Sequence, residues 1–239
     1  MLSLFTDVSN IIKILLVMII AYLLGSLNIA IIVTKIFTGK DIRTMGSGNG
    51  GFTNVMRSVG TTAGIITFVG DFLKCVISVL IGGFLFKTLR TDVFTTRELW
   101  KYGEYLAGMC CFLGHVYPIY FKFKGGKGVV TVAALAAIIN FPVFLIAFAA
   151  FAIVFLCTKI VSISSIISAV VLFAATASVV YFYNYKTVGN VSLDYVIVAS
   201  TSTFVICAAV IAKHHANIKR LLKGEEKKLV LKKKEKTEQ

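Results

Sequence analysis

Residues 129–158 read VVTVAALAAIINFPVFLIAFAAFAIVFLCT, an almost uninterrupted apolar run with Asn140, Phe141 and Pro142 at its centre. The run could form one long kinked helix or two short helices joined by a turn. Proline lacks a backbone donor and disfavours helical geometry at the residue before it, so this triplet is a reasonable turn. Each arm is then shorter than the roughly 20 residues of a usual membrane span. The number of helices in this run decides the topology of the chain.

The composition of the chain identifies it as a membrane protein. It has 239 residues, of which 57% are hydrophobic and 15% charged, and its mean hydropathy is +0.87. A soluble domain of this size could not easily hide so much apolar surface. No linker rich in Pro, Gly or Ser divides it, so we expect one all-α bundle over 1–212 and a basic tail over 213–239. Residues 1–10 lack a basic start, and no cleavage site follows, so the first apolar stretch is predicted to be a retained helix.

The distribution of Lys and Arg settles the number of helices. Candidate spans are 11–34, 61–86, 103–121, 129–140, 142–158, 160–183 and 193–212. The segments 35–57, 122–127, 159 and 213–239 contain 4, 3, 1 and 10 Lys or Arg, whereas 87–101 and 184–192 contain 4 and 1. The positive-inside rule puts the first set in the cytoplasm, which requires an even number of crossings between Lys127 and Lys213. Two helices within 129–158 satisfy this requirement. We therefore predict seven transmembrane helices, with the N-terminus outside and the C-terminus cytoplasmic.

The net charge of +14 could indicate nucleic acid, anionic lipid or an anionic substrate as the partner. The basic tail follows the last apolar segment directly, as expected of a segment attracted to anionic phospholipid headgroups. We assign this role to Lys232, Lys233, Lys234 and Lys236, and we expect no nucleic-acid partner. The cysteines lie in apolar stretches without metal-ligand spacing, so we expect neither a disulfide framework nor a metal site.

A glycine-rich segment, GSGNGGFTN at 46–54, follows the first predicted span, and Arg57 comes shortly after it. Closely spaced glycines let the backbone adopt positive φ and turn several amides toward one point, while Ser, Asn and Thr side chains add donors. An arginine can complete such an anion site with a bidentate fork. A flexible polar turn is the alternative, but the density of donors beside an arginine favours phosphate binding. The predicted phosphate-binding residues are Ser47, Gly48, Asn49, Thr53, Asn54 and Arg57.

A second glycine-rich segment, KFKGGKG at 122–128, leads directly into the helix predicted from Val129. A helix start offers free amides and the positive end of the macrodipole, and adjacent glycines let a phosphate approach the backbone. The segment is not a Walker A loop, because Phe121 stands where the first Gly should be and Val129 is not the Ser or Thr that would bind Mg²⁺. A basic loop at the membrane interface is the alternative. The candidate anion-binding residues are Gly125, Gly126 and Lys127.

A third polar cluster, VSISS at 161–165, follows Lys159 at the predicted start of a helix. Serines in this position usually cap the helix or bond back to its backbone, so the cluster taken alone is expected to be mainly structural.

The fourth cluster, KHHANIKR at 213–220, is followed by Gly224, Glu225 and Glu226. His214 and Asn217 are three residues apart and share a face of the predicted helix, so one ligand could meet both. A basic juxtamembrane helix is the alternative. The predicted topology puts all four clusters on the cytoplasmic side, and we assign 213–226 to the functional site.

Two charged residues interrupt the predicted span 61–86. Isolated charges in a span cost about 2.5 to 3.5 kcal/mol, and the i, i+3 spacing of Asp71 and Lys74 allows them to neutralise one another. We predict a structural ion pair near the site. His115, just before Tyr117 and Pro118, is expected to fix a helix end above the second glycine-rich segment.

The polar blocks together resemble the bacterial acyl-phosphate:glycerol-3-phosphate acyltransferase family. The resemblance starts with Asp41-Ile42-Arg43, Gly46-Ser47-Gly48-Asn49, Thr53-Asn54-Val55 and Arg57. It continues, in the family's order, with Gly114-His115, the KFKGGKGV block, Val161-Ser162, and His214, Asn217, Ile218, Arg220 and Leu221. The match spans nearly the whole chain. It departs at Phe52, where the family usually has a small residue, and Phe52 could reshape the substrate pocket.

The resemblance implies a seven-helix enzyme of the bacterial cytoplasmic membrane with its active site on the cytoplasmic side. Its substrates would be acyl phosphate and glycerol 3-phosphate, its product 1-acyl-glycerol 3-phosphate, and no cofactor would be needed. By motif position it implies catalytic roles for His214, Asn217, Lys127 and Ser162, and substrate binding by Ser47, Arg57, Arg220 and Glu225. The adjacent Glu226 is an alternative to Glu225.

Both proposed substrates carry phosphate, which accounts for two glycine-rich anion sites on one face of a bundle. Acyl phosphate has a good leaving group, so we expect direct attack by the glycerol hydroxyl, without a covalent acyl-enzyme. No G-x-S-x-G elbow is present. The proton would pass either to the acyl phosphate's own oxygen or to His214. A carrier for a phosphorylated metabolite is the alternative function, although carriers usually have polar or helix-breaking residues near the bilayer midplane.

Overall fold

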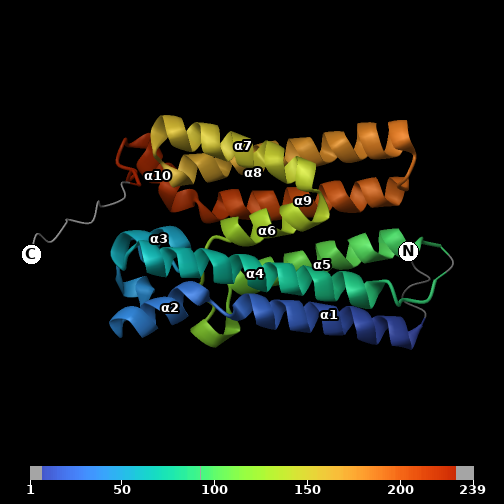
Figure 1. Ribbon diagram of the computed structural model, residues 1–239, viewed down its shortest axis with the longest axis horizontal. Helices are drawn as coiled ribbons and strands as arrows, with labels where there is room; N and C mark the ends of the chain where they lie inside the picture. The colour runs from blue at the N-terminus through green and yellow to red at the C-terminus, as the bar shows by residue number, and fades with distance from the viewer. Residues whose placement is uncertain (1–6, 92, 230–239) are drawn as a thin grey trace, which may run out of the picture.

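The computed structural model describes residues 7–91 and 93–229, and within these ranges it contains helices and no strands. The α-helices form a bundle in which the long ones run side by side (Figure 1). They are α1 (Val8–Ser26), α2 (Ile29–Thr38), α3 (Phe52–Ser58), α4 (Thr61–Phe86), α5 (Thr96–Val116), α6 (Val129–Ile139), α7 (Phe141–Thr158), α8 (Val161–Ser178), α9 (Leu193–Lys213) and α10 (His215–Leu222). A π-helix over Val179–Val188 extends α8. The lysines of the far tail, Lys232 to Lys236, lie outside the described residues.

Within residues 7–91 and 93–229, five helical stretches are long and apolar enough to cross a membrane. They are Val8–Thr38, Thr61–Phe86, Phe141–Thr158, Val161–Val188 and Leu193–Lys213. Of the remaining predicted spans, α6 is apolar but has only 11 residues, and α5 carries several charges. An all-helical membrane bundle is therefore confirmed, and seven crossings remain a prediction.

The apolar run 129–158 forms two helices, as its central triplet predicts. Asn140 ends α6 and begins α7, where its Oδ1 accepts a hydrogen bond of 3.3 Å from the amide of Val143. Pro142 lies in the first turn of α7, where its missing N–H would have had no partner within the helix. The turn brings α7 back antiparallel to α6 (Figure 1).

The prediction of one unbroken helix over 11–34 is wrong, because the chain breaks at Leu27 and Asn28. Asn28 has an extended backbone, and its Oδ1 accepts a hydrogen bond of 3.0 Å from the amide of Ile31, which makes it the N-cap of α2. A capping Asn offers the backbone an alternative to continuing the helix. The apolar count across the break hid this signal.

The predicted start of the helix over 103–121 is also wrong, since α5 begins at Thr96. Thr95 and Glu98 form a capping box at this start. The charges that argued against a helix here are neutralised locally: the ammonium of Lys101 lies 2.8 Å from the carboxylate of Glu104. The buried carboxylate of Glu98 accepts a bond of 3.1 Å from the amide of Ser192. The helix ends at Val116, and Ile119–Phe121 forms a separate 3₁₀ turn.

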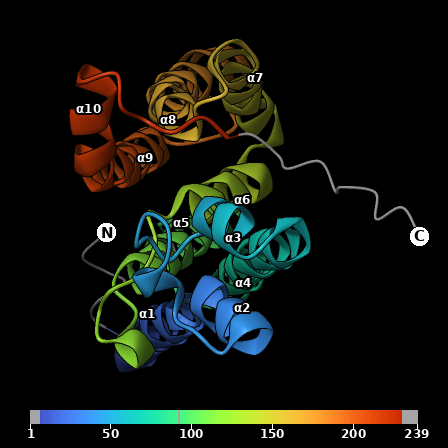
Figure 2. The same ribbon diagram turned by 90° about the vertical axis from the view of Figure 1, so that its left-hand side faces the viewer.

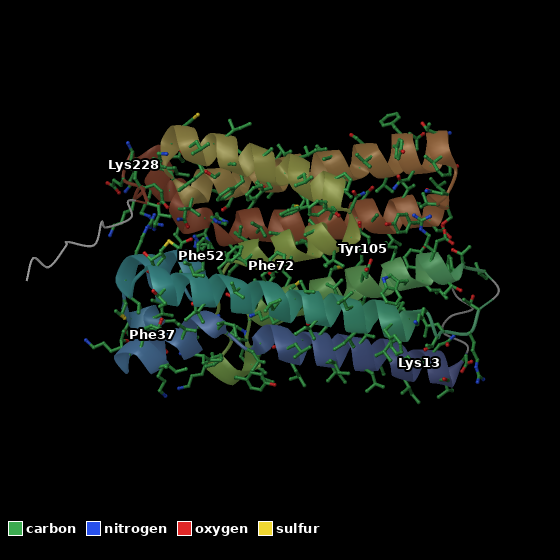
Figure 3. All side chains as sticks on the ribbon, viewed as in Figure 1. Lys13, Phe37, Phe52, Phe72, Tyr105 and Lys228 are labelled. Atoms are coloured by element: carbon green, nitrogen blue, oxygen red, sulfur yellow. The ribbon has the colours of Figure 1, made fainter. Side chains whose placement is uncertain are left out.

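The helices form two groups with α6 between them (Figure 2). One group contains α1 to α5 and the other contains α7 to α10, while α6 contacts α4, α5 and α7. Cys157 is exposed, the other four cysteines are buried, and all five are free. The end of the bundle that carries α2, α3 and α10 also carries Phe37, Phe52 and Lys228, whereas Lys13 lies at the opposite end (Figure 3). The glycine-rich segments and the fourth cluster therefore share one end.

A close crossing of α4 and α5 depends on Gly82 and Gly103. A Cβ on Gly103 would collide with the carbonyl oxygen of Gly82, which cannot move without shifting α4. We expect Gly103→Ala to lower the melting temperature in detergent by about 5 °C, since overpacking of this kind typically costs 1–3 kcal/mol. Gly70→Ala is the control, because its Cβ would meet side-chain atoms of Ile29 and no backbone carbonyl. Equal losses in the two variants would contradict the role of the crossing.

Candidate active site

The first glycine-rich segment is folded around the side chain of Asn54. Its Nδ2 donates hydrogen bonds of 3.0 Å to the carbonyls of both Met45 and Asn49, and its Oδ1 accepts one of 3.0 Å from the amide of Ser47. Asn54 is 4% exposed. Gly46 and Gly48 have φ of 58° and 71°, the left-handed conformation that glycine adopts without strain. Asn54 therefore shapes the segment, and the exposed Ser47 and Gly48 face outward.

Arg43 links the two glycine-rich segments. Its Nη1 donates hydrogen bonds of 2.7 Å to the carbonyl of Phe121 and 3.3 Å to that of Lys124. Its Nη2 lies 2.6 Å from Asp41, and this hydrogen-bonded guanidinium lowers the pKa of that carboxyl. Arg43 is therefore a structural residue whose role the sequence did not reveal, although the motif block containing it was recognised.

The second glycine-rich segment is held against the end of α5. The amides of Gly125 and Gly126 donate bonds of 3.2 and 3.1 Å to the carbonyls of Val116 and His115. Gly126 also lies against Gly50 of the first segment, so closely that a Cβ on Gly126 would meet the Gly50 carbonyl oxygen at 2.7 Å. The two segments thus touch directly.

Lys127, Ser162, Asn217, Arg220 and Glu226 form one polar cluster, which we call the carboxylate cluster. Ser162 Oγ and Asn217 Nδ2 donate to Glu226 Oε1 at 2.9 and 2.6 Å, and Arg220 Nε donates to Glu226 Oε2 at 2.7 Å. Lys127 Nζ donates to Asn217 Oδ1. These residues come from three regions that are distant in sequence, around 127, 162 and 217–226, as expected of a functional site and not of a simple helix cap.

The environment of the carboxylate cluster changes the pKa values of its charged members. Burial lowers the pKa of Lys127 to about 8, although Glu226 opposes the shift. Burial alone would raise the pKa of Glu226, but hydrogen bonds from Asn217, Arg220 and Ser162 outweigh it and lower this pKa. At neutral pH the cluster therefore holds a protonated Lys127 beside an ionised Glu226.

His214 is buried beside the cluster at the junction of α9 and α10. Its Nδ1 lies 2.7 Å from the carbonyl of Val210, so the proton sits on Nδ1 and Nε2 is left as an acceptor. Burial, and next the positive charge of Lys127, lower the pKa of His214 to about 4. The imidazole is therefore neutral near pH 7. His215 is exposed and does not join the cluster.

The structure brings most of the predicted residues to one end of the bundle. Arg57 on α3 donates a bond of 2.8 Å from Nη2 to the carbonyl of Lys227, which joins the first glycine-rich segment to the carboxylate cluster. Thr53 and Asn49 are partly buried beside it. Ser164 and Ser165 bond back to carbonyls four residues earlier, as predicted for structural serines, whereas Ser162 does not.

The carboxylate in the cluster belongs to Glu226. Glu225 is exposed, and among the described residues no contact of its side chain is seen. The two residues are adjacent, so motif position alone could not separate them. The geometry favours Glu226, because the chain turns at Gly224, where φ is 71°, and points the second carboxylate inward.

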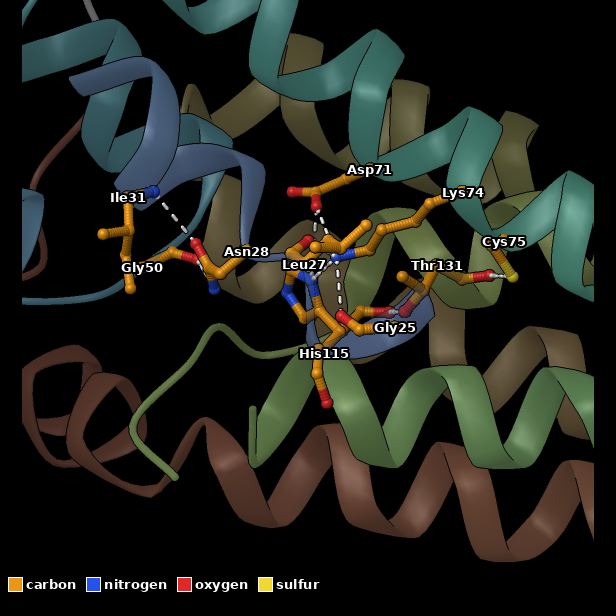
Figure 4. Close-up of polar contacts among 12 residues, drawn as sticks. Gly25, Leu27, Asn28, Ile31, Gly50, Asp71, Lys74, Cys75, His115 and Thr131 are labelled. Atoms are coloured by element: carbon orange, nitrogen blue, oxygen red, sulfur yellow. Dashed lines mark hydrogen bonds and ion pairs between the residues drawn. The ribbon is translucent and has the colours of Figure 1, made fainter. Parts of the chain in front are cut away.

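Asp71 and Lys74 form the predicted ion pair, at 2.8 Å, and His115 completes a buried group with them (Figure 4). His115 Nδ1 lies 3.1 Å from Lys74 Nζ. The predicted ion pair is confirmed, and the group contacts the second glycine-rich segment through the bond from Gly126 to His115.

Comparison with known proteins agrees with the motif blocks. The family model described as glycerol-3-phosphate acyltransferase matches residues 15–224. The glycerol-3-phosphate acyltransferase of Clostridioides difficile (strain 630) is 38% identical over 219 residues, covering 92% of this chain and 97% of the relative. That of Bartonella henselae (strain Houston 1) is 34% identical over 214 residues, covering 90% of each.

Two solved structures are also similar. They are crystal structures of PlsY (YgiH), an integral membrane glycerol 3-phosphate acyltransferase, in a glycerol 3-phosphate form and a lysophosphatidic acid form. The first has a TM-score of 0.73 at 32% identity and covers 91% of this chain and 96% of that chain. The second has a TM-score of 0.70 at 31% identity and covers 91% and 95%. The chain therefore belongs to the glycerol-3-phosphate acyltransferase family, whose members are membrane acyltransferases of phospholipid synthesis.

Proposed function

We propose that this protein transfers an acyl chain from acyl phosphate to the 1-hydroxyl of glycerol 3-phosphate, giving 1-acyl-glycerol 3-phosphate (lysophosphatidic acid) and phosphate. The observation that carries the proposal is the contact between two anion-binding sets at one end of the bundle. The first glycine-rich segment with Arg57 meets the carboxylate cluster through the bond from Arg57 to Lys227. Two neighbouring phosphate sites suit a reaction in which both substrates carry phosphate. The glycerol 3-phosphate and lysophosphatidic acid forms of PlsY support the same substrate and product.

Each set has a proposed ligand. The donors of the first segment and Arg57 would bind glycerol 3-phosphate, since a guanidinium and the hydroxyl of the exposed Ser47 suit a phosphate dianion. The donors of the carboxylate cluster would bind the phosphate of the acyl donor beside Gly125 and Gly126, whose amides are bonded to the end of α5. The first set comprises Ser47, Gly48, Asn49, Thr53 and Arg57, while Asn54 shapes their segment. The second set comprises Lys127, Ser162, Asn217 and Arg220, while Glu226 orients these donors.

The reaction needs no covalent acyl-enzyme. The glycerol 1-hydroxyl oxygen forms a bond to the acyl carbonyl carbon, the bond from that carbon to the phosphate oxygen breaks, and phosphate departs. Holding the two substrates together supplies much of the rate enhancement. The protonated Lys127 would stabilise negative charge that develops on the donor, in a site sheltered from water.

The hydroxyl proton has two possible acceptors, His214 and the donor's own phosphate. The low pKa of about 4 makes His214 a weak base, and general bases work best with a pKa near the operating pH. We therefore propose that the leaving phosphate takes the proton and that His214 fixes the geometry around Lys127.

Changing His214 to Ala should consequently raise the KM for substrate by about tenfold and leave kcat within a few-fold of the wild-type value. The measurement is kcat and KM between pH 5 and 9. His215→Ala, which removes the exposed neighbour, is the control. A large fall in kcat together with loss of an acidic limb in the pH profile would instead make His214 the base.

For the topology we propose seven crossings, with the active-site end in the bacterial cytoplasm. Three observations support this: the basic residues at this end, the two helices within 129–158, and the start of α1 at the end opposite α10 (Figure 1). The bundle over 1–212 would then form the membrane domain, and 213–226 would complete the site. Labelling of single cysteines placed at Thr91 and at Lys122 by an impermeant reagent in intact cells should modify only the former.

The deciding experiment uses purified protein, glycerol 3-phosphate and palmitoyl phosphate. Formation of lysophosphatidic acid with stoichiometric release of phosphate is expected. If neither product forms and reconstituted vesicles take up glycerol 3-phosphate instead, the protein is a carrier.

A further inference from the structure

The buried group of Asp71, Lys74 and His115 takes no part in the proposed reaction, although it lies next to the glycine-rich segments. All three side chains are 5% exposed or less. Lys74 Nζ lies 2.8 Å from the Asp71 carboxylate and 3.1 Å from His115 Nδ1. A buried ion pair is by itself weak evidence for stability, because desolvation offsets the attraction. The further contacts of Lys74 show what else the group can do.

Lys74 also completes the break between α1 and α2. Its ammonium donates hydrogen bonds to the carbonyls of Gly25 and Leu27, at 3.0 and 2.7 Å (Figure 4). The last carbonyls of a helix have no partner within the helix, and an apolar setting offers them no water. Lys74 supplies that partner and thereby fixes the position at which the chain turns into α2.

Asn28 connects the break between α1 and α2 to the first glycine-rich segment. This residue caps α2 with its Oδ1, and its Nδ2 donates a bond of 3.2 Å to the carbonyl of Gly50. The Asn28 side chain is fully buried, so its orientation follows the backbone at the break. The position of Gly50 therefore depends on the turn that Lys74 stabilises.

His115 connects Lys74 to the second glycine-rich segment. Its carbonyl accepts the amide of Gly126 at 3.1 Å. Its ring lies so close to Gly126 that a Cβ there would collide with Nε2, and the same Cβ would meet the carbonyl oxygen of Gly50. Lys74 thus reaches both glycine-rich segments, one through Asn28 and the other through His115.

We propose that Lys74 is a positioning residue, held in place by Asp71 and His115. It fixes the two glycine-rich segments relative to one another, so that Arg57 and Lys127 can bind one pair of substrates at the same time. For its consequence in catalysis this proposal rests on the proposed function. The geometric part of the proposal, that Lys74 holds the second glycine-rich segment in place, does not rest on the proposed function.

The rival explanation is an ion pair that only stabilises the helices. The double variant Asp71→Asn/Lys74→Met separates the two, because it removes both charges and leaves no unpaired charge in the bundle. Replacing a buried ion pair by neutral residues is often neutral for stability. A purely stabilising pair would then be dispensable for activity, whereas a positioning ammonium would not.

The matched control lies at the opposite end of the bundle. Lys101 and Glu104 form a pair of the same spacing and the same 2.8 Å separation, and Lys101 also donates to a backbone carbonyl, that of Ile139. Lys101→Met/Glu104→Gln should retain wild-type kcat/KM. Asp71→Asn/Lys74→Met should lower the melting temperature by a few degrees, because the carbonyls of Gly25 and Leu27 lose their partner. It should remain folded and lose about 100-fold in kcat/KM, as small misplacements of reacting groups do. Asn28→Ser, which keeps a capping oxygen and loses the donor to Gly50, should lose about tenfold with the ion pair intact.

A second readout does not depend on enzyme activity. If Lys74 holds the second segment, trypsin should cut after Lys124 or Lys127 at least tenfold faster in Asp71→Asn/Lys74→Met than in the wild type or the control pair. Mass spectrometry of the purified full-length proteins gives the sites. Unchanged cleavage, or wild-type kcat/KM in the double variant, would overturn the proposal, as would an equal loss of activity in the control pair. Faster cleavage in a chain whose wild type forms no product would leave the positioning role standing and refute the proposed function.

Discussion

Replacing Lys127 by Met is expected to lower kcat/KM by about 1,000-fold. Lys127 lies in the carboxylate cluster with its ammonium on Asn217, and its protonated form would stabilise charge that develops on the donor phosphate. Loss of one such donor in a sheltered site typically costs 100- to 1,000-fold. The measurement is the initial rate of lysophosphatidic acid formation at subsaturating acyl phosphate. Lys124→Met, three residues earlier in the same segment and exposed, should retain wild-type activity.

The pH profile gives the same prediction a second test. With a pKa of about 8, Lys127 is protonated below that pH and loses its charge above it. The kcat/KM of the wild type should therefore fall as the pH rises through about 8. Lys127→Arg keeps its charge at high pH and should shift this alkaline limb upward by at least one unit. An identical limb in both proteins would show that another group titrates there.

The Arg57→Ala variant is expected to raise the KM for glycerol 3-phosphate by about 100-fold with a smaller effect on the KM for acyl phosphate. Hydrogen bonds to charged groups contribute up to about 3 kcal/mol, which corresponds to roughly two orders of magnitude in affinity. Arg57→Lys keeps the charge without the planar fork and should recover about tenfold of the loss. Both constants come from initial rates with each substrate varied in turn.

The control for Arg57 is Arg97→Ala, an exposed arginine at the opposite end of the bundle. It should leave both KM values unchanged. Because Arg57 also bonds to the carbonyl of Lys227, its loss could loosen the carboxylate cluster. A rise confined to the KM for acyl phosphate would show that this contact, and not glycerol 3-phosphate binding, is the role of Arg57.

Apolar patterning predicted the helices well where charge or proline marks their limits. The predicted span 61–86 coincides with α4, and the turn at Pro142 is present. The break at Asn28 was missed because the apolar count across it hid the capping Asn, and because sequence could not show the bonds of Lys74 and Gly50 to this turn. The early start of α5 was missed because Lys101 and Glu104 neutralise one another, which hydropathy cannot register.

The candidate site was predictable as a set of blocks and not as a geometry. Glycine density and basic residues pointed to the segments that contain Ser47 and Lys127. The sequence could not show that the Asn54 side chain bonds to the backbone of its own segment. Nor could it show that Glu226, and not Glu225, points into the cluster. Both outcomes depend on the direction in which a loop leaves a helix, and that direction is set by packing across the bundle.

The carboxylate of Glu226 comes from the stretch that follows α10, the last helix of the described residues. A polypeptide that ends before residue 226, through premature termination or clipping, would hold all ten α-helices and lack one wall of the site. Such a product could insert into the membrane, and a measurement of its helix content would not distinguish it from the intact protein. Acyl-transfer activity would then separate such a product from a chain that includes Glu226, because this residue follows α10 and completes the carboxylate cluster.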